Sequence, residues 1–225
     1  MDNILLIETS TTLCSVALAQ DGKITSYRES SAPKAHASLT AVFIQEMLAE
    51  HGLTLADCDA ICVSKGPGSY TGLRVGVSTA KGLCFGSGKP LLAVGTLATL
   101  VAQADEIGGI KYIIPMIDAR RMEVYTAVFE NGVQITETSP MIIDETSFAE
   151  YLEQGPCLFI GDGAGKCADV IKHPNAQFCQ CWPKASAMLK PAMAAYKEKR
   201  FDDFAYFEPF YLKDFVATVS KKKLW

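Results

Sequence analysis

An internal repeat constrains the fold of this 225-residue chain more than any other feature. The first copy reads as a buried strand "NILLIE" ending at Glu8, a strand "CSVALAQ", a tight Asp-Gly turn at Gly22 and a third strand. The second copy has "KYIIPMID" ending at Asp118, then "VYTAVFE", an Asn-Gly turn at Gly132 and "ITETSPMII". Fourteen residues separate Glu8 from Gly22, and fourteen separate Asp118 from Gly132. The spacing predicts a duplicated unit.

Each copy continues with alternating helical and strand patterns. In the first copy we expect a helix at 37–51, a strand at 60–64, a helix at 73–85 and a strand at 91–94. In the second copy we expect a helix at 147–153, a strand at 158–161, a helix at 164–171 and a last helix at 185–199.

Three strands followed by helix, strand and helix are typical of a mixed α/β sheet. The sequence therefore predicts two similar lobes built from βββαβα units, residues 1–104 and 105–225, facing each other across a cleft. The boundary falls at 104–111, where Gly108-Gly109 marks a linker. The last segment is expected to pack back on the first lobe.

A glycine-rich loop, "GPGSYTGLRVG", joins a predicted strand to a predicted helix at residues 66–76. Such a loop can cradle a phosphate, because glycines let the backbone approach and the helix N-terminus offers free N–H groups. Gly66, Gly68 and Ser69 are then the candidate contacts. The alternative is a plain strand-to-helix turn capped by Ser69. No Gly-Lys-Ser/Thr follows, which excludes a Walker A loop.

A second glycine-rich stretch, "GDGAGK", follows the strand expected in the other lobe. It is not a P-loop, because one spacer residue is missing and Cys167 stands where Ser or Thr would bind magnesium. We expect a turn there, with Gly161 and Gly163 able to border a nucleotide.

Two carboxylates end the first strand of each lobe. Glu8 and Asp118 could hold a metal–phosphate complex or act as acid and base, and Thr9 and Ser10 add hydroxyl groups suited to phosphate oxygens. Capping of the two turns is the simpler interpretation.

The helices expected at 37–51 and 73–85 carry more apolar surface than one buried face requires. They either lie deeply buried or dock on another subunit, and we expect docking for part of that surface. The candidate docking residues are Leu39, Val42, Phe43, Met47, Leu73, Val77, Ala80 and Lys81.

Composition narrows the function classes. With a net charge of −4, the chain is a poor stand-alone binder of nucleic acid. The basic cluster at 220–225 is either a solubilising tail or an RNA contact. Asp2 and Glu8 exclude a signal peptide, and no run approaches the roughly 20 apolar residues of a membrane span, so we expect a cytoplasmic protein with reduced cysteines. No metal site is expected, since the three histidines show no ligand spacing.

The motifs "LLIETSTTLCSVAL", "GPGSYTGLRVGVSTAKGL", "IDARRMEVY" and "EPFYLKD" occur in this order and cover most of the chain. Together they resemble the TsaB (YeaZ) family of bacterial threonylcarbamoyladenosine synthesis proteins. Two positions depart from the family pattern: Glu8 stands where Asp is usual, and Lys213 where Arg is usual. The first departure puts autonomous metal–nucleotide binding in doubt.

The resemblance implies an actin-like fold, of the Hsp70, sugar-kinase and RNase H-like type. It also implies a paralogue, TsaD, whose catalytic metal is held by two histidines in an HxxxH motif. By that motif the two histidine positions fall here on Thr96 and Leu100, which cannot form such a site.

The resemblance therefore implies a non-catalytic subunit. It would bind TsaD and, with TsaE and ATP, support transfer of threonylcarbamoyl to the tRNA adenosine beside the anticodon. ATP and the metal would be held through TsaD, tRNA would be met only in the complex, and the chain alone could form a homodimer through the same helices. The alternatives are a stand-alone small-molecule kinase or ATPase of the same fold and, against the missing histidines, a metallopeptidase.

Overall fold

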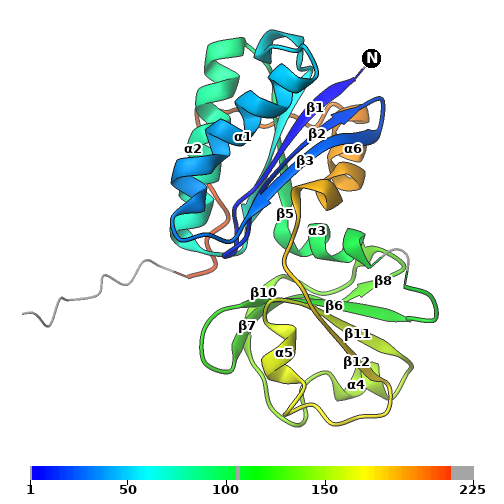
Figure 1. Cartoon of the computed structure of the whole chain (residues 1–225). Helices are drawn as coiled ribbons and strands as arrows, with labels where there is room; N and C mark the ends of the chain where they lie inside the picture. The colour runs from blue at the N-terminus through cyan, green and yellow to red at the C-terminus, as the bar shows by residue number, and fades with distance from the viewer. Residues whose placement is uncertain (1, 105–106, 214–225) are drawn as a thin grey trace, which may run out of the picture.

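A computed structural model describes residues 2–104 and 107–213, which form two lobes, each built on its own β-sheet (Figure 1). The first sheet has five strands in the order β3-β2-β1-β4-β5. The second has seven strands, with the central order β10-β7-β6-β11-β12 and with β8 and β9 attached beside β6. The basic cluster at 220–225 lies outside the described residues.

The first lobe begins with an antiparallel meander and continues with parallel strands. Its strands are β1 (Asn3–Glu8), β2 (Cys14–Gln20), β3 (Lys23–Ser30), β4 (Ala60–Gly66) and β5 (Leu91–Gly95). Helices α1 (Ala35–Glu50) and α2 (Tyr70–Ser87) cover one face of this sheet, and η2 (Ala185–Met188) with α6 (Leu189–Lys197) covers the other (Figure 1). A short turn, η1 (Leu55–Asp57), precedes β4.

The first strand shows why this sheet lies between two helical layers. Leu5 and Ile7 pack into the cluster under α1 and α2, whereas Ile4 and Leu6 pack into the cluster under α6. Successive strand residues point to opposite faces, so an unbroken apolar run requires apolar cover on both sides.

The second lobe repeats this pattern with shorter elements. Its strands are β6 (Tyr112–Asp118), β7 (Glu123–Thr126), β8 (Phe129–Glu130), β9 (Val133–Gln134), β10 (Ser139–Ile142), β11 (Cys157–Gly161) and β12 (Ala176–Gln180). Its helices are α4 (Ala149–Leu152) and α5 (Ala164–Cys167). Helix α3 (Thr96–Gln103) precedes the expected boundary, yet Leu97 and Leu100 pack against Ile117 and Leu158 of the second sheet.

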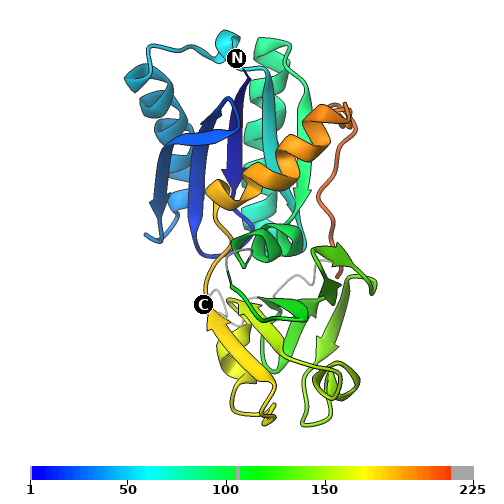
Figure 2. The same cartoon turned by 90° about the vertical axis from the view of Figure 1, so that its right-hand side faces the viewer.

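The chain returns to the first lobe after β12. Its last described residues, 199–213, form an irregular segment with a turn at 204–206, which we call the C-terminal strap. Asp202 N–H donates to the carbonyl of Leu91, and Phe210 N–H donates to that of Lys65. The strap therefore runs along the β4–β5 edge of the first lobe and continues down to the second lobe (Figure 2).

Most predicted elements are confirmed, including both turns at Gly22 and Gly132, where the preceding residues have positive φ. The prediction of one strand over "VYTAVFE" is wrong. The strand breaks at 127–128, where the Val128 N–H donates to Thr136 Oγ1, so that β7 pairs with β10 and β8 pairs with β9. Strand β12 and helix α3 were not predicted, and the helices expected at 147–153 and 164–171 are shorter.

Candidate functional site

The glycine-rich loop makes a capped start for α2. Ser69 is the N-cap, and its Oγ accepts a hydrogen bond from Gly72 N–H at 3.3 Å. Ser69 N–H donates in turn to the carbonyl of Ser10 at 2.6 Å. The capping interpretation of Ser69 is therefore confirmed.

The space beside the glycines holds backbone of the same chain. A Cβ atom at Gly68 would stand 2.3 Å from Ser10 O, and one at Gly72 would stand 2.1 Å from Thr9 O. Gly66, with φ of +107°, lies against the strap, where a Cβ would be 2.8 Å from Phe210 O. The glycines thus allow three segments to meet at backbone distance, which is the same freedom that a phosphate cradle would use.

The carboxyl group of Glu8 lies under this junction. It is fully buried, so the expectation that it faces an open cleft is wrong. Glu8 Oε1 accepts a hydrogen bond from Ser10 N–H at 2.7 Å, while Oε2 has no partner among the described residues. Burial raises the pKa of Glu8 to about 7, because the charged form loses its hydration.

The two hydroxyl residues beside Glu8 are buried as well. Thr9 Oγ1 donates to the carbonyl of Gly72 at 2.8 Å, and Ser10 Oγ has no partner among the described residues. Thr9, Ser10 and Glu8 therefore form the underside of the α2 start rather than a surface that faces solvent.

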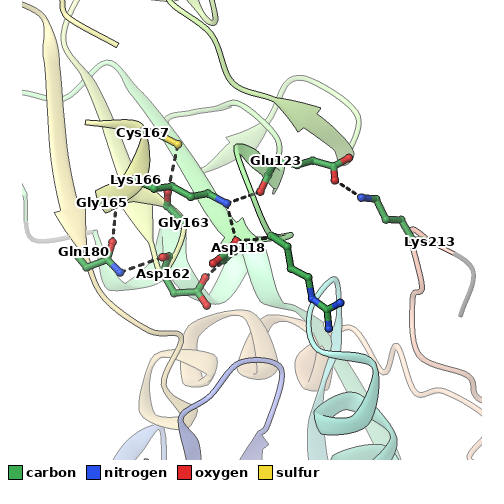
Figure 3. Close-up of polar contacts among 10 residues, drawn as sticks. Asp118, Glu123, Asp162, Gly163, Gly165, Lys166, Cys167, Gln180 and Lys213 are labelled. Carbon is green, nitrogen blue, oxygen red and sulfur yellow. Dashed lines mark hydrogen bonds and ion pairs between the residues drawn. The ribbon is translucent and has the colours of Figure 1, made fainter. Parts of the chain in front are cut away.

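The corresponding corner of the second lobe is open (Figure 3). The Asp118 side chain is 46% exposed, and its Oδ1 accepts from Lys166 Nζ at 2.6 Å and from Arg120 N–H at 2.7 Å. Lys166 Nζ also donates to the Glu123 carbonyl at 2.6 Å. Glu8 and Asp118 thus occupy opposite environments, one buried and one exposed and ion-paired, unlike a matched pair of carboxylates facing one cleft.

The "GDGAGK" segment forms a turn that packs against β6. Gly161 has φ of +134°, and a Cβ there would stand 2.2 Å from Met116 O. Gly163 N–H donates to the same Met116 carbonyl at 3.0 Å. Neither glycine leaves room for an added Cβ, because backbone or side-chain atoms already lie against both.

Sequence reasoning missed two side chains at this turn. Asp162 Oδ1 accepts from Asp118 N–H at 2.9 Å, and desolvation by burial raises the pKa of Asp162 to about 6. Gln180 Nε2 donates to the Asp162 carbonyl, and its Oε1 accepts from Gly165 N–H (Figure 3). Asp162 is visible in the motif, but Gln180 comes from the unpredicted strand β12.

Thr96 and Leu100, the two positions where the resemblance would place histidines, lie in the core. Thr96 Oγ1 is 2.9 Å from Ser64 Oγ in a buried hydrogen bond, and Leu100 is buried among the apolar residues between α3 and the second sheet. Both side chains therefore have structural roles within this chain.

The predicted docking residues divide into two groups. Met47, Leu73, Val77 and Ala80 are buried in the core of the first lobe, so their side chains cannot also supply exposed contact area. The prediction is wrong for these four, because the two helices turn these side chains toward the interior of the lobe.

The other docking residues remain at the surface. Val42 is 41% exposed, and Leu39 and Phe43 are half-buried. Lys81 is half-buried, and its Nζ donates to the carbonyls of Ala205 and Phe207 in the strap. Phe85, near the end of α2, is 80% exposed and was not among the candidates.

Comparison with known proteins identifies the family. A family model described as TsaD, tRNA N6-adenosine threonylcarbamoyltransferase, matches residues 29–221. The tRNA threonylcarbamoyladenosine biosynthesis protein TsaB of Escherichia coli is 32% identical, over 95% of this chain and 96% of the relative. The chain belongs to the TsaB family. TsaB of Haemophilus influenzae is 30% identical, over 95% of this chain and 94% of the relative.

Solved structures agree with the TsaB assignment. YeaZ from Pseudomonas aeruginosa superposes with a TM-score of 0.81 at 29% identity, over 94% of this chain and all of that chain. The activator of the 2-hydroxyisocaproyl-CoA dehydratase from Clostridium difficile, solved with bound ADPNP, superposes with a TM-score of 0.51 at 10% identity, over 88% and 96%. The fold of this TsaB-family chain is the two-lobed actin-like fold. Within residues 2–104 and 107–213, no helix combines the length and apolar character needed to cross a bilayer.

Proposed function

We propose that this chain is a non-catalytic subunit required for threonylcarbamoyladenosine modification of tRNA. It binds the catalytic subunit TsaD and, with TsaE and ATP, supports transfer of the threonylcarbamoyl group to the adenosine beside the anticodon. The observation that carries the proposal is similarity to two TsaB proteins over more than nine-tenths of this chain and of each relative.

The geometry at the ends of β1 and β6 favours a non-catalytic role for this chain. The glycine loop packs on Thr9 and Ser10 of the same chain, and Lys166 already pairs with Asp118. The groups that could bind a phosphate thus already form contacts with other residues of their own lobe. ATP and its metal ion are accordingly held by TsaD in this proposal.

The surface of α1 and α2 is the proposed docking site for TsaD. Val42 and Phe85 expose apolar area there, and half-buried Leu39 and Phe43 extend it. Apolar side chains left at a surface gain free energy when a partner removes them from water. The same surface would support a homodimer when TsaD is absent.

Reconstitution tests the function directly. TsaD, TsaE, ATP, the threonylcarbamoyl donor and tRNA are combined with and without this protein, and modified adenosine is quantified by mass spectrometry. We expect modification only when the protein is present. Equal modification without it would contradict the proposal. Turnover of ATP by the pure protein, lost in Asp118→Asn, would favour the kinase or ATPase alternative.

A further inference from the structure

The turn between β6 and β7 has an unfavourable backbone for its residues. Arg120 and Arg121 are consecutive, with φ of +74° and +51°. Glycine adopts such angles at little cost and asparagine tolerates them, whereas arginine does not favour them. The chain's other two hairpin turns with positive φ use Asp-Gly ending at Gly22 and Asn-Gly ending at Gly132. A sequence chosen for stability alone would use the same residues here.

Hydrogen bonds from backbone N–H groups hold this turn without help from the two arginine side chains. Arg120 N–H donates to Asp118 Oδ1 at 2.7 Å, and Glu123 N–H donates to the Arg120 carbonyl at 3.1 Å. Arg120 and Arg121 are both exposed, and neither guanidinium forms a hydrogen bond or ion pair with another residue in the described part of the chain. The strain therefore serves the placement of the side chains rather than the packing of the lobe.

Four basic and three acidic side chains surround the turn, which leaves one positive charge in excess, and neither arginine belongs to an ion pair there. Lys166 pairs with Asp118, and Lys213 of the strap pairs with Glu123 (Figure 3). Asp162 is the other acid at this corner, and its Oδ1 is directed to the Asp118 N–H. The corner thus presents two exposed guanidinium groups beside two ion pairs.

This geometry fits an extended polyanion better than a small ligand. Cavities of about 580 and 470 Å³ lie elsewhere on the described surface, and neither is lined by Arg120 or Arg121. A mononucleotide needs a concave site that covers its base. Guanidinium groups on an exposed turn suit phosphate groups along a nucleic-acid backbone, which arginine binds in a bidentate manner.

We propose that Arg120 and Arg121 form a contact site for the phosphodiester backbone of RNA. The proposal rests on the proposed function, because that function brings tRNA to the complex. With a net charge of −4, the chain gains only a weak contact from two arginines, so the site adds to RNA binding that other subunits provide.

The test variant combines Arg120→Asn with Arg121→Gly, which removes both charges and supplies residues that accept positive φ. The matched control combines Lys34→Asn with Lys199→Gly. These two lysines are exposed, have φ of +64° and +53°, and lie at the start of α1 and after α6. The control therefore makes the same change in charge and the same relief of strain elsewhere.

RNA binding is measured by fluorescence anisotropy with a labelled tRNA transcript, for the chain alone and for the chain mixed with TsaD of the same organism. Salt is varied over about 50–200 mM. We expect the arginine variant to lose roughly tenfold in affinity at the lowest salt, and its salt slope to fall by about one per arginine. The control should bind as the wild type does, while both variants gain about 2–4 °C or more in Tm.

Three outcomes would overturn the proposal. The wild type could fail to bind RNA in either setting, the arginine variant could match the wild type, or the control could lose as much affinity as the arginine variant. Calorimetry with ATP adds a fourth: ATP binding that disappears with the arginines would identify a nucleotide phosphate rather than RNA. Binding to TsaD, measured without RNA, reports on the proposed function separately, because the arginine variant should retain it.

Discussion

Gly72 lies directly against Thr9: a Cβ atom at position 72 would stand 2.1 Å from the Thr9 carbonyl oxygen, and Thr9 Oγ1 donates to the Gly72 carbonyl at 2.8 Å. The start of α2 and the turn after β1 are therefore joined through backbone atoms. A side chain at position 72 would have to push one segment away from the other.

Gly72→Ala should destabilise the protein by about 1–3 kcal/mol, because the methyl group overlaps a backbone oxygen that cannot rotate away. Gly82→Ala is the matched control in the same helix, with no atom within 4 Å of its added Cβ. The control should gain about 0.5–1 kcal/mol from helix propensity. Urea denaturation of both variants gives the two free energies, and equal signs would contradict the packing described.

Glu8 should make stability depend on pH. Its folded-state pKa is about 7 against an ordinary value of 4.5, so the folded state retains a proton that the unfolded state loses. The free energy of unfolding should fall as pH rises from about 4.5 to 7 and then level off, by about 3 kcal/mol in total. Below 4.5 both states are protonated and the penalty is absent.

Glu8→Gln should remove this contribution and reduce the slope between pH 5 and 7 by up to about 1.4 kcal/mol per pH unit. Urea titrations at several pH values measure it, with exposed Glu153→Gln as the control for the same chemical change. Asp162 contributes a slope of the same sign at lower pH, since its pKa is about 6. An unchanged slope in the Glu8 variant would show that Glu8 is ionised in the folded protein.

The docking surface is tested where side chains are exposed. Val42→Glu and Phe85→Glu should each weaken TsaD binding by about tenfold or more, because a charge would be buried at the contact. Val77→Glu is unsuitable, since Val77 lies in the core and its loss would report on folding. Ile142→Glu, at a position 73% exposed on β10, is the control. Calorimetry that finds all three variants equal to the wild type would exclude this surface.

Lys81 should hold the strap on α2. Lys81→Met removes the two hydrogen bonds from Nζ to Ala205 O and Phe207 O, both 3.1 Å long. Amide exchange over residues 204–208 should accelerate by roughly tenfold or more, since hydrogen bonds from charged groups contribute about 1.5–3 kcal/mol. Lys34→Met, at the exposed residue that precedes α1, is the control for the same change of charge. Unchanged exchange in the Lys81 variant would mean that the aromatic residues alone hold the strap.

Much of the fold could be predicted from the sequence because the signals were local. The run from Asn3 to Glu8 and the two Asp/Asn-Gly turns each determine their own geometry. The break between β7 and β8 could not be predicted, since it depends on a hydrogen bond from Val128 to Thr136 in a later loop. Strand β12 was missed because "AQFCQ" mixes polar and apolar residues without a clear period.

The interpretation of the glycine loop remained open for a physical reason. Gly68, Gly72 and Gly76 are needed because Thr9 and Ser10 approach them, and a phosphate would require the same absence of side chains. A usable signal was the spacing of four residues between these glycines, which marks one side of a helix for close backbone contact. The burial of Val77 and Ala80 was equally ambiguous, because apolar helix positions do not distinguish a core from an interface.

The strap has a mechanical consequence. Two connections join the lobes apart from the strap: helix α3, which packs against strands of both sheets, and the segment between β12 and η2. The strap adds a third connection, because Tyr211 packs against Tyr70 of the first lobe and Lys213 pairs with Glu123 of the second (Figure 3). We therefore expect residues 209–213 to restrict movement of one lobe relative to the other.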